Sequence, residues 1–182
     1  MSSRYRNLFH LVLTAMFLAL AMVLPFLTGQ IPQIGNMLCP MHIPILLCGF
    51  FCGPWYGCII GFVAPLLRFV LFGMPPIFPT GVSMCFELAV YGMVSGILYR
   101  RLSQKPKNVY ISLLVAMLAG RMMWGFVQVI IWGLGKSKFG WAAFISGAFT
   151  TAIPGMIVQI VVIPILVITA KRIIPTGKEN RF

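Results

Sequence analysis

The chain has 182 residues, of which 60% are hydrophobic and only 9% are charged, and it contains no Asp. So few polar residues cannot cover the surface of a water-soluble domain, which excludes that class. The net charge of +12 comes from 14 scattered Lys and Arg residues, mostly at the edges of apolar runs, and this pattern does not favour nucleic-acid binding. We predict an all-α membrane protein that lies in the lipid bilayer.

Six apolar runs predict six transmembrane helices in a single transmembrane domain, residues 1–182, since no internal repeat or low-complexity tract divides the chain. The predicted helices cover residues 9–28, 43–53, 55–73, 80–99, 109–134 and 141–171. Five of them approach or exceed the ~20 residues that cross a bilayer. The second has about 11, so it is either a short, half-buried helix or one arm of a tight hairpin that closes at Gly53-Pro54.

Basic residues mark one side of the predicted bundle. Ten of them flank helix ends on that side, and two lie on the other. The ten are Arg4, Arg6, Arg100, Arg101, Lys105, Lys107, Lys171, Arg172, Lys178 and Arg181, and the two are Lys136 and Lys138. Because Lys and Arg concentrate on the cytoplasmic side, we predict a plasma-membrane protein with both termini in the cytoplasm.

The first apolar run has a second interpretation. Arg4 and Arg6 precede a stretch that holds Ala19-Leu20-Ala21, whose small residues have the spacing of a signal-peptide cleavage site. Cleavage would leave five spans and break the charge asymmetry, so a retained first helix fits the sequence better.

Three ionisable residues lie inside the apolar runs, namely Arg68, Glu87 and Arg121. Each costs about 2.5–3.5 kcal/mol at a helix centre, so each needs a partner. The predicted helix directions let all three reach the outer half of the bundle interior. Two cations would then face one anion, and the residual positive charge would suit a carboxylate or phosphate on a ligand.

Helical spacing places polar and aromatic side chains beside these charges. One face of the fifth helix carries positions 121, 124, 128 and 132, and one face of the fourth carries positions 83, 87 and 91. The residues are Arg121, Trp124, Gln128 and Trp132 on the first face, and Ser83, Glu87 and Tyr91 on the second. Aromatic faces with a few charged or amide groups are typical of a small-molecule site. Alternatively, Glu87 only ties two helices together, and the tryptophans belong to an interfacial belt.

Two outer loops, residues 29–42 and 73–79, carry no Lys, Arg, Asp or Glu and are rich in Pro, Gly and apolar residues. They are interpreted either as lids over a ligand or as segments packed on the outer end of the bundle. Asn36 lies in the first loop and His42 ends it, and both are candidate ligand contacts. His42 could equally serve only to terminate the loop.

Enzyme chemistry is not predicted. The two histidines have no accompanying nucleophile and carboxylate that would make a triad, and one intramembrane carboxylate makes no acid–base pair. The five cysteines include no CxxC pair, so we expect no disulfide framework, metal site or cofactor. The sequence also lacks the G-x-x-x-x-G-K-[ST] pattern of a P-loop, so ATP hydrolysis is not expected of this chain.

The first helix carries Ala15-Met16-Phe17-Leu18-Ala19, a small-x-x-x-small pattern that lets another helix approach closely in a bilayer, although packing within one chain also uses it. The chain combines this pattern with six predicted helices, a short second helix that ends in Gly53-Pro54, and two lid-like loops. In this combination it resembles the substrate-binding S component of energy-coupling factor (ECF) vitamin transporters, over nearly its whole length.

The resemblance implies the substrate-specific subunit of an ECF-type ABC importer, which captures a vitamin or related small micronutrient outside the cell. It implies a transmembrane coupling protein and two cytoplasmic ATPase subunits as partners, with Ala15 and Ala19 in contact with the coupling protein. The outer halves of helices four to six and the outer loops would hold the ligand. Family members that import nickel or cobalt use an amino-terminal His, whereas this chain begins Met1-Ser2-Ser3, so a metal substrate is not expected.

Two other functions stay open. A self-sufficient secondary carrier or channel would need more than one intramembrane acid or a pair of broken helices. A structural or assembly factor would bind no ligand. For a ligand, three chemistries fit: a purine-like or pterin-like edge beside Glu87, a cationic ring against Glu87 and the tryptophans, or an anionic tail at Arg68 or Arg121.

Overall fold

The structure is a computed structural model that describes residues 3–28, 40–103, 105–134 and 153–173. These residues form six α-helices and no strand. The helices are α1 (Ser3–Val23), α3 (His42–Cys52), α4 (Pro54–Phe72), α5 (Val82–Arg101), α6 (Pro106–Leu134) and α8 (Ile153–Ile173), with short helical turns η1 (Leu24–Thr28) after α1 and η2 (Ile77–Gly81) before α5. The predicted helix boundaries agree closely from the second run to the fifth. The first helix begins earlier than predicted, and the start of the sixth predicted helix, residues 141–152, lies outside the described residues.

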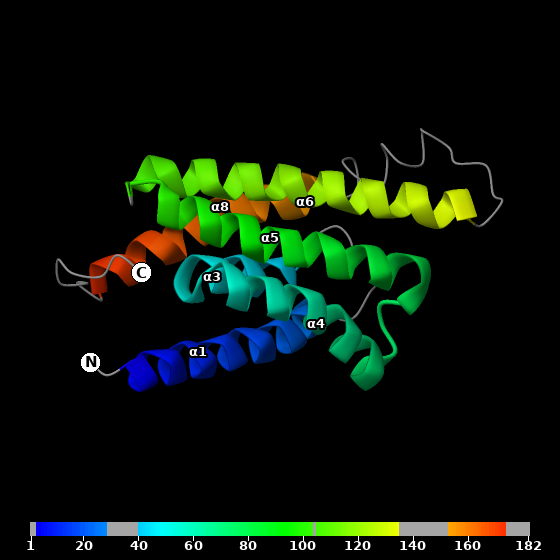
Figure 1. Cartoon of the computed structure of the whole chain (residues 1–182), viewed down its shortest axis with the longest axis horizontal. Coiled ribbons are helices and arrows are strands. Elements are labelled where there is room, and N and C mark those ends of the chain that lie inside the picture. Colours follow the sequence, from blue (N-terminus) through cyan, green and yellow to red (C-terminus); the bar gives the residue numbers. More distant parts are fainter. Residues whose placement is uncertain (1–2, 29–39, 104, 135–152, 174–182) are drawn as a thin grey trace.

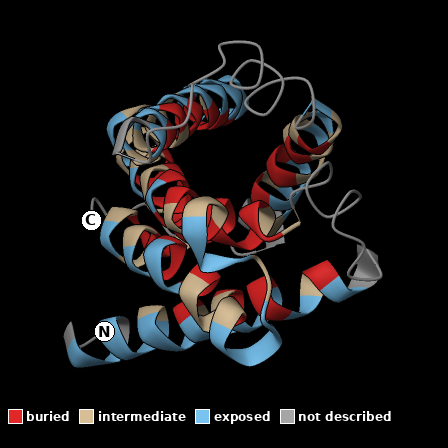
Figure 2. Cartoon of the chain, turned by 90° about the vertical axis from the view of Figure 1, so that its right-hand side faces the viewer, coloured by how far each residue is buried: buried red, intermediate tan, exposed pale blue. Residues whose placement is uncertain are grey.

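The helices lie side by side along one long axis, and α1 begins and α8 ends at the same end of the bundle (Figure 1). We call this the terminal end and the opposite one the far end. Seen along the axis, the buried residues occupy the sides of the helices that face one another, and the exposed residues face outward (Figure 2). Within the described residues, five helical segments are long and apolar enough to cross a membrane, and α3 is shorter.

The connection between α3 and α4 is a tight reversal at Gly53. This residue has φ 103°, a conformation that residues with a side chain rarely adopt, and Pro54 begins α4 at its first position. The side chain of Arg100, near the end of α5, occupies the space where a Cβ on Gly53 would lie. Its Nη2 donates a hydrogen bond to the carbonyl oxygen of Cys52 at 3.0 Å, which places a positive charge at the C-terminus of α3. The predicted short helix and the predicted hairpin are therefore two descriptions of one compact element.

Glycines bring α3, α4 and α5 into backbone contact. A Cβ on Gly57 would lie 2.7 Å from the carbonyl oxygen of Gly92 and 2.9 Å from the Cα of Gly49. A Cβ on Gly96 would lie 2.6 Å from the backbone nitrogen of Pro54. Real Cβ atoms do not approach so closely, so each position requires glycine. We call Gly49, Gly57, Gly92 and Gly96 the glycine contact.

Two outer helices complete the bundle. The buried side of α1 carries Phe17 and Ala21, and the Phe17 ring stacks on Phe51 of α3 at a centroid distance of 6.1 Å. The buried side of α8 carries Ile163 and Val167, and α8 packs on α3 and α6. The opposite sides of both helices are apolar and exposed, as expected for surfaces that meet lipid.

Candidate functional site

A buried ion pair lies between α5 and α6. Arg121 Nη1 lies 3.2 Å from Glu87 Oε1, and the two side chains are 8% and 2% exposed. His42 Nε2, at the start of α3, lies 3.7 Å from the same carboxylate oxygen, with its side chain 3% exposed. Glu87 is five residues into α5, about 8 Å along the helix axis from Val82. Three helices thus bring one acid and two basic groups together in the half of the bundle toward the far end, and we call these three residues the Glu87 cluster.

Tyr91 forms the side of the Glu87 cluster that faces the terminal end. Its ring meets the His42 ring edge to face, with centroids 5.3 Å apart, and its side chain interacts with the Glu87 carboxylate. A Cβ on Gly120 would collide with the Tyr91 ring. Because Gly120 has no side chain, α6 can approach α5 closely here. This close approach places Arg121, the next residue of α6, beside Glu87.

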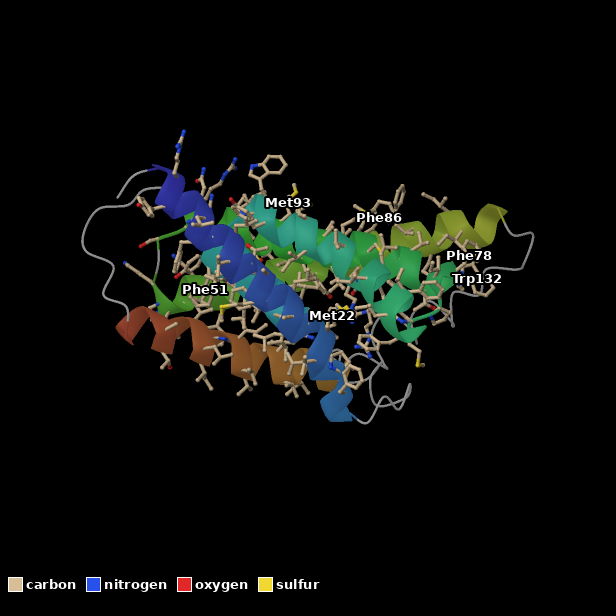
Figure 3. All side chains as sticks on the ribbon, turned by 90° about the horizontal axis from the view of Figure 1, so that it is seen from below. Met22, Phe51, Phe78, Phe86, Met93 and Trp132 are labelled. Atoms are coloured by element: carbon tan, nitrogen blue, oxygen red, sulfur yellow. The ribbon has the colours of Figure 1, made fainter. Side chains whose placement is uncertain are left out.

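The predicted polar face of α6 exists as one continuous face. Gln128 is buried, Trp124 is half-buried, and Trp132 is 40% exposed. Trp132 Nε1 donates a hydrogen bond to Gln128 Oε1 at 3.0 Å, so these two side chains lie against each other. Figure 3 places Trp132 and Phe78, which precedes α5, at the far end of the bundle. The face therefore runs from the buried Arg121 to an exposed aromatic end.

Arg68 lies apart from the Glu87 cluster. Its Nη1 donates a hydrogen bond to the carbonyl oxygen of Met22 at 3.1 Å, and its guanidinium lies over the rings of Phe26 and Phe72 at 5.7 and 5.6 Å. It thus ties the end of α4 to the end of α1. Within the described residues, Arg121 and His42 are the only basic side chains within 4.0 Å of Glu87. One Arg, not two, faces the carboxylate, and a ligand contact of Arg68 stays a prediction.

The remaining predicted ligand contacts lie partly within and partly outside the residues that the structure describes. Ser83 is buried and donates a hydrogen bond to the carbonyl oxygen of Pro79 at 3.0 Å, one turn earlier. Asn36 and the loop around it lie outside the described residues. In the other predicted lid, η2 begins at Ile77 and leads into α5, and Phe78 is exposed. Whether either loop closes over a ligand stays a prediction.

A cleft opens between α6 and α8 beside Arg121, with a volume of about 170 Å³. Apolar side chains and the arginine line it, namely Leu114, Met117, Leu118, Arg121, Met156 and Ile160. Along the sequence, Gln159 lies between Met156 and Ile160, the two residues of α8 in this lining, and Gln159 is 1% exposed. Its Oε1 has no hydrogen-bond partner among the described residues. We did not predict Gln159 as a site residue, although one amide in the apolar run of α8 is a signal of the same kind as Gln128.

The described residues contain no group of three or more His, Cys, Asp or Glu side chains that could hold a metal ion. The Glu87 cluster supplies one carboxylate, one guanidinium and one imidazole in a site that water reaches poorly. Such a set can orient and hold a polar group of a small molecule by hydrogen bonds and charge.

A family model described as "ECF transporter, substrate-specific component" matches residues 9–167. The matched segment runs from α1 into α8 and includes the Glu87 cluster, the α6–α8 cleft and the glycine contact. No curated protein and no solved structure matches the chain significantly.

Proposed function

The chain belongs to the substrate-specific components of ECF transporters, and from this membership we propose that it captures a vitamin or related small micronutrient at the Glu87 cluster. Members of this family are multi-pass membrane transport subunits and not enzymes. The observation that carries the proposal is the buried Glu87–Arg121 pair with His42 beside it, in a bundle whose interior is mostly apolar. Intramembrane ionisable groups are expensive, and they usually mark the path or the site of a substrate.

The position of the cluster supports capture from outside. The basic residues Arg4, Arg100 and Arg101 lie near the terminal end, and this supports our proposal that this end is cytoplasmic, with both termini inside and six membrane-embedded helices. The Glu87 cluster then lies in the outer half of the membrane. The exposed aromatic side chains of Trp132 and Phe78 lie beyond it, where an entering ligand would meet them first.

Delivery requires partners in this proposal. A transmembrane coupling protein would pack on α1, and two cytoplasmic ATPase subunits would drive release. Ala15 and Ala19 are both exposed on α1, beside the exposed Met16, so a second helix can approach the α1 backbone there.

Reconstitution tests the proposal against a self-sufficient carrier. Proteoliposomes that contain the full chain alone, or the chain with the coupling protein and both ATPases, would be supplied with a labelled mixture of vitamins and ATP inside or outside. We expect uptake only in the complete assembly and only when ATP reaches the ATPase side. Uptake by the chain alone would contradict the proposal and favour the carrier.

A further inference from the structure

Arg68 is a buried cation that has no carboxylate beside it within the described residues. It is 6% exposed, and a guanidinium keeps its charge in a protein. The carboxylate contacts shorter than 4.0 Å in this part of the chain belong to Glu87, and Arg68 makes none of them. Glu179, the second acid of the chain, lies outside the described residues. The Glu87 cluster therefore leaves the charge of Arg68 unbalanced, at a cost in free energy.

The protein meets part of the hydrogen-bonding capacity of this guanidinium. Among the described residues it makes one hydrogen bond, from Nη1 to the carbonyl oxygen of Met22 in the last turn of α1. The C-terminus of a helix supplies only about half a negative elementary charge. The other nitrogens of Arg68 are not among the buried atoms without a partner, so they reach the surface of the protein. An arginine has five N–H donors, and an anion at that surface can accept from the remaining ones.

The contacts of the guanidinium place it at the boundary of the membrane. The 19 residues of α4 give this helix a length of about 28 Å, close to the ~30 Å thickness of the hydrocarbon core. Phe72 is the last residue of α4, and Phe26 lies in η1, beyond the end of α1. The guanidinium of Arg68 lies over both rings, so it is at the level where the two helices end. Lipid headgroups begin at this depth.

The surroundings of the guanidinium belong to the outside of the bundle. The rings of Phe26 and Phe72 meet edge to face at a centroid distance of 4.9 Å, and these two residues are 41% and 38% exposed. Val70 and Leu71, just before the end of α4, are exposed as well. Apolar surfaces of this kind face lipid in a membrane. The anion nearest to the guanidinium is therefore the headgroup phosphate of a neighbouring lipid.

We propose that Arg68, with the rings of Phe26 and Phe72, forms a binding site for a phospholipid at the far end of the bundle. The lipid phosphate accepts hydrogen bonds from the guanidinium, whose planar fork matches phosphate oxygens, and it supplies the missing negative charge. The acyl chains lie on the apolar surface beside the two rings, which favours a lipid over a soluble anion. This site is separate from vitamin capture at the Glu87 cluster, and it does not depend on which end of the bundle is cytoplasmic.

Native mass spectrometry of the purified full chain tests this inference. The delipidated chain in mild detergent is equilibrated separately with phosphatidylglycerol, diacylglycerol and inorganic phosphate, and the bound molecules per chain are counted. Basic residues at the terminal end also attract anionic headgroups, so the chain carries three substitutions at exposed positions there, Arg101→Gln, Lys105→Gln and Lys107→Gln. We expect this triple variant to retain phosphatidylglycerol with about fivefold preference over diacylglycerol, which corresponds to about 1 kcal/mol.

Substitutions in the triple variant then probe the site itself. Arg68→Met keeps a long side chain and removes the charge, so retention of phosphatidylglycerol should fall about fivefold, to the level of diacylglycerol. Val70→Met, at an exposed position near the same helix end, is the matched control and should leave retention unchanged. Arg68→Lys keeps the charge and loses the planar fork, so it should retain less phosphatidylglycerol than arginine does and more than methionine does.

Three results would overturn the inference. The first is unchanged retention of phosphatidylglycerol in Arg68→Met or, if that variant does not fold, in Arg68→Lys. The second is equal retention of diacylglycerol and phosphatidylglycerol, which would mean an apolar lipid surface without a phosphate site. The third is retention of inorganic phosphate in place of phosphatidylglycerol, which would mean a soluble anion. Glu87→Gln should leave lipid retention unchanged, so the lipid site and vitamin capture can fail independently.

Discussion

The two halves of the bundle differ in what fills the space between the helices. Toward the terminal end, the glycine contact brings three helix backbones together, and a side chain at Gly57 or Gly92 has no room. Toward the far end, the long side chains of Glu87, Arg121 and His42 meet between the helices, and a cleft opens beside them. The first half holds the helices mainly by close backbone packing, which small residues allow between helices in lipid. The second half keeps close contacts at Gly61 and Gly120 and adds groups that can recognise a ligand.

The largest expected effect comes from filling the glycine contact. Gly92→Val places a branched side chain against the backbone of α4 at Gly57, where no side chain can move aside. We expect a loss of more than about 4 kcal/mol of stability and little folded monomer by gel filtration. Met93→Val, at the exposed neighbouring position, is the control and should behave as the native protein does. A Gly92→Val protein as stable as the native one would contradict the close packing of α4 on α5.

Breaking the ion pair should come second. Glu87→Gln leaves Arg121 buried without its partner and should cost about 3 kcal/mol, with membrane insertion intact and retention of the native ligand weakened. The double variant Glu87→Gln with Arg121→Gln should regain at least about 1 kcal/mol of stability in thermal unfolding, but not the retention. If the losses in free energy of unfolding for the two single substitutions added up to the loss for the double variant, Glu87 and Arg121 would not be coupled. Unchanged retention in Glu87→Gln would remove Glu87 from the site.

Arg68 provides a smaller and more selective test. Arg68→Met removes the hydrogen bond to the Met22 carbonyl and the contacts with two rings, and we expect a loss of about 1–2 kcal/mol in thermal unfolding. Ligand retention should stay within a factor of two, because the Arg68 guanidinium is hydrogen-bonded to the Met22 carbonyl of α1. If ligand retention fell by much more than a factor of two while the loss of stability stayed at about 1–2 kcal/mol, Arg68 would belong to the ligand site.

The smallest effect is expected at the α3–α4 reversal. Arg100→Gln removes the positive charge and a hydrogen bond at the C-terminus of α3, and the thermal unfolding should shift by about 0.5–1 kcal/mol. Arg101→Gln, one residue along at an exposed position, should change it less. Equal effects of the two substitutions would mean that the contact with Cys52 contributes nothing.

Sequence periodicity predicted which faces of α5 and α6 are buried, but it did not predict the balance of charges around Glu87. The buried faces of α5 and α6 follow from spacing of three and four residues, and they carry Ser83, Glu87 and Tyr91 on one helix and Arg121 and Gln128 on the other. Spacing along one helix does not say which charge on another helix lies opposite. Hence the sequence directed both arginines at Glu87, and the structure brings only one of them there.

Two features escaped the sequence analysis although their signals were present. The patterns Gly57-Cys58-Ile59-Ile60-Gly61 and Gly92-Met93-Val94-Ser95-Gly96 are small-x-x-x-small patterns, as is the one in the first helix, and they lie at the interface of α4 and α5. Gln159 is a buried amide in an apolar helix. A search that gave every such pattern and every polar residue equal weight would have found both.

The sequence by itself determined that the chain is helical, that it lies in a membrane, and roughly where the helices from α3 to α6 begin and end. These properties depend on local composition and on the length that crosses a bilayer, which are read along one dimension. Only the tertiary structure decided that Arg121 pairs with Glu87, that Arg68 binds α1, and that a cleft opens between α6 and α8. These outcomes depend on the rotation and depth of each helix against its neighbours, which the packing of side chains and glycines across several helices sets together.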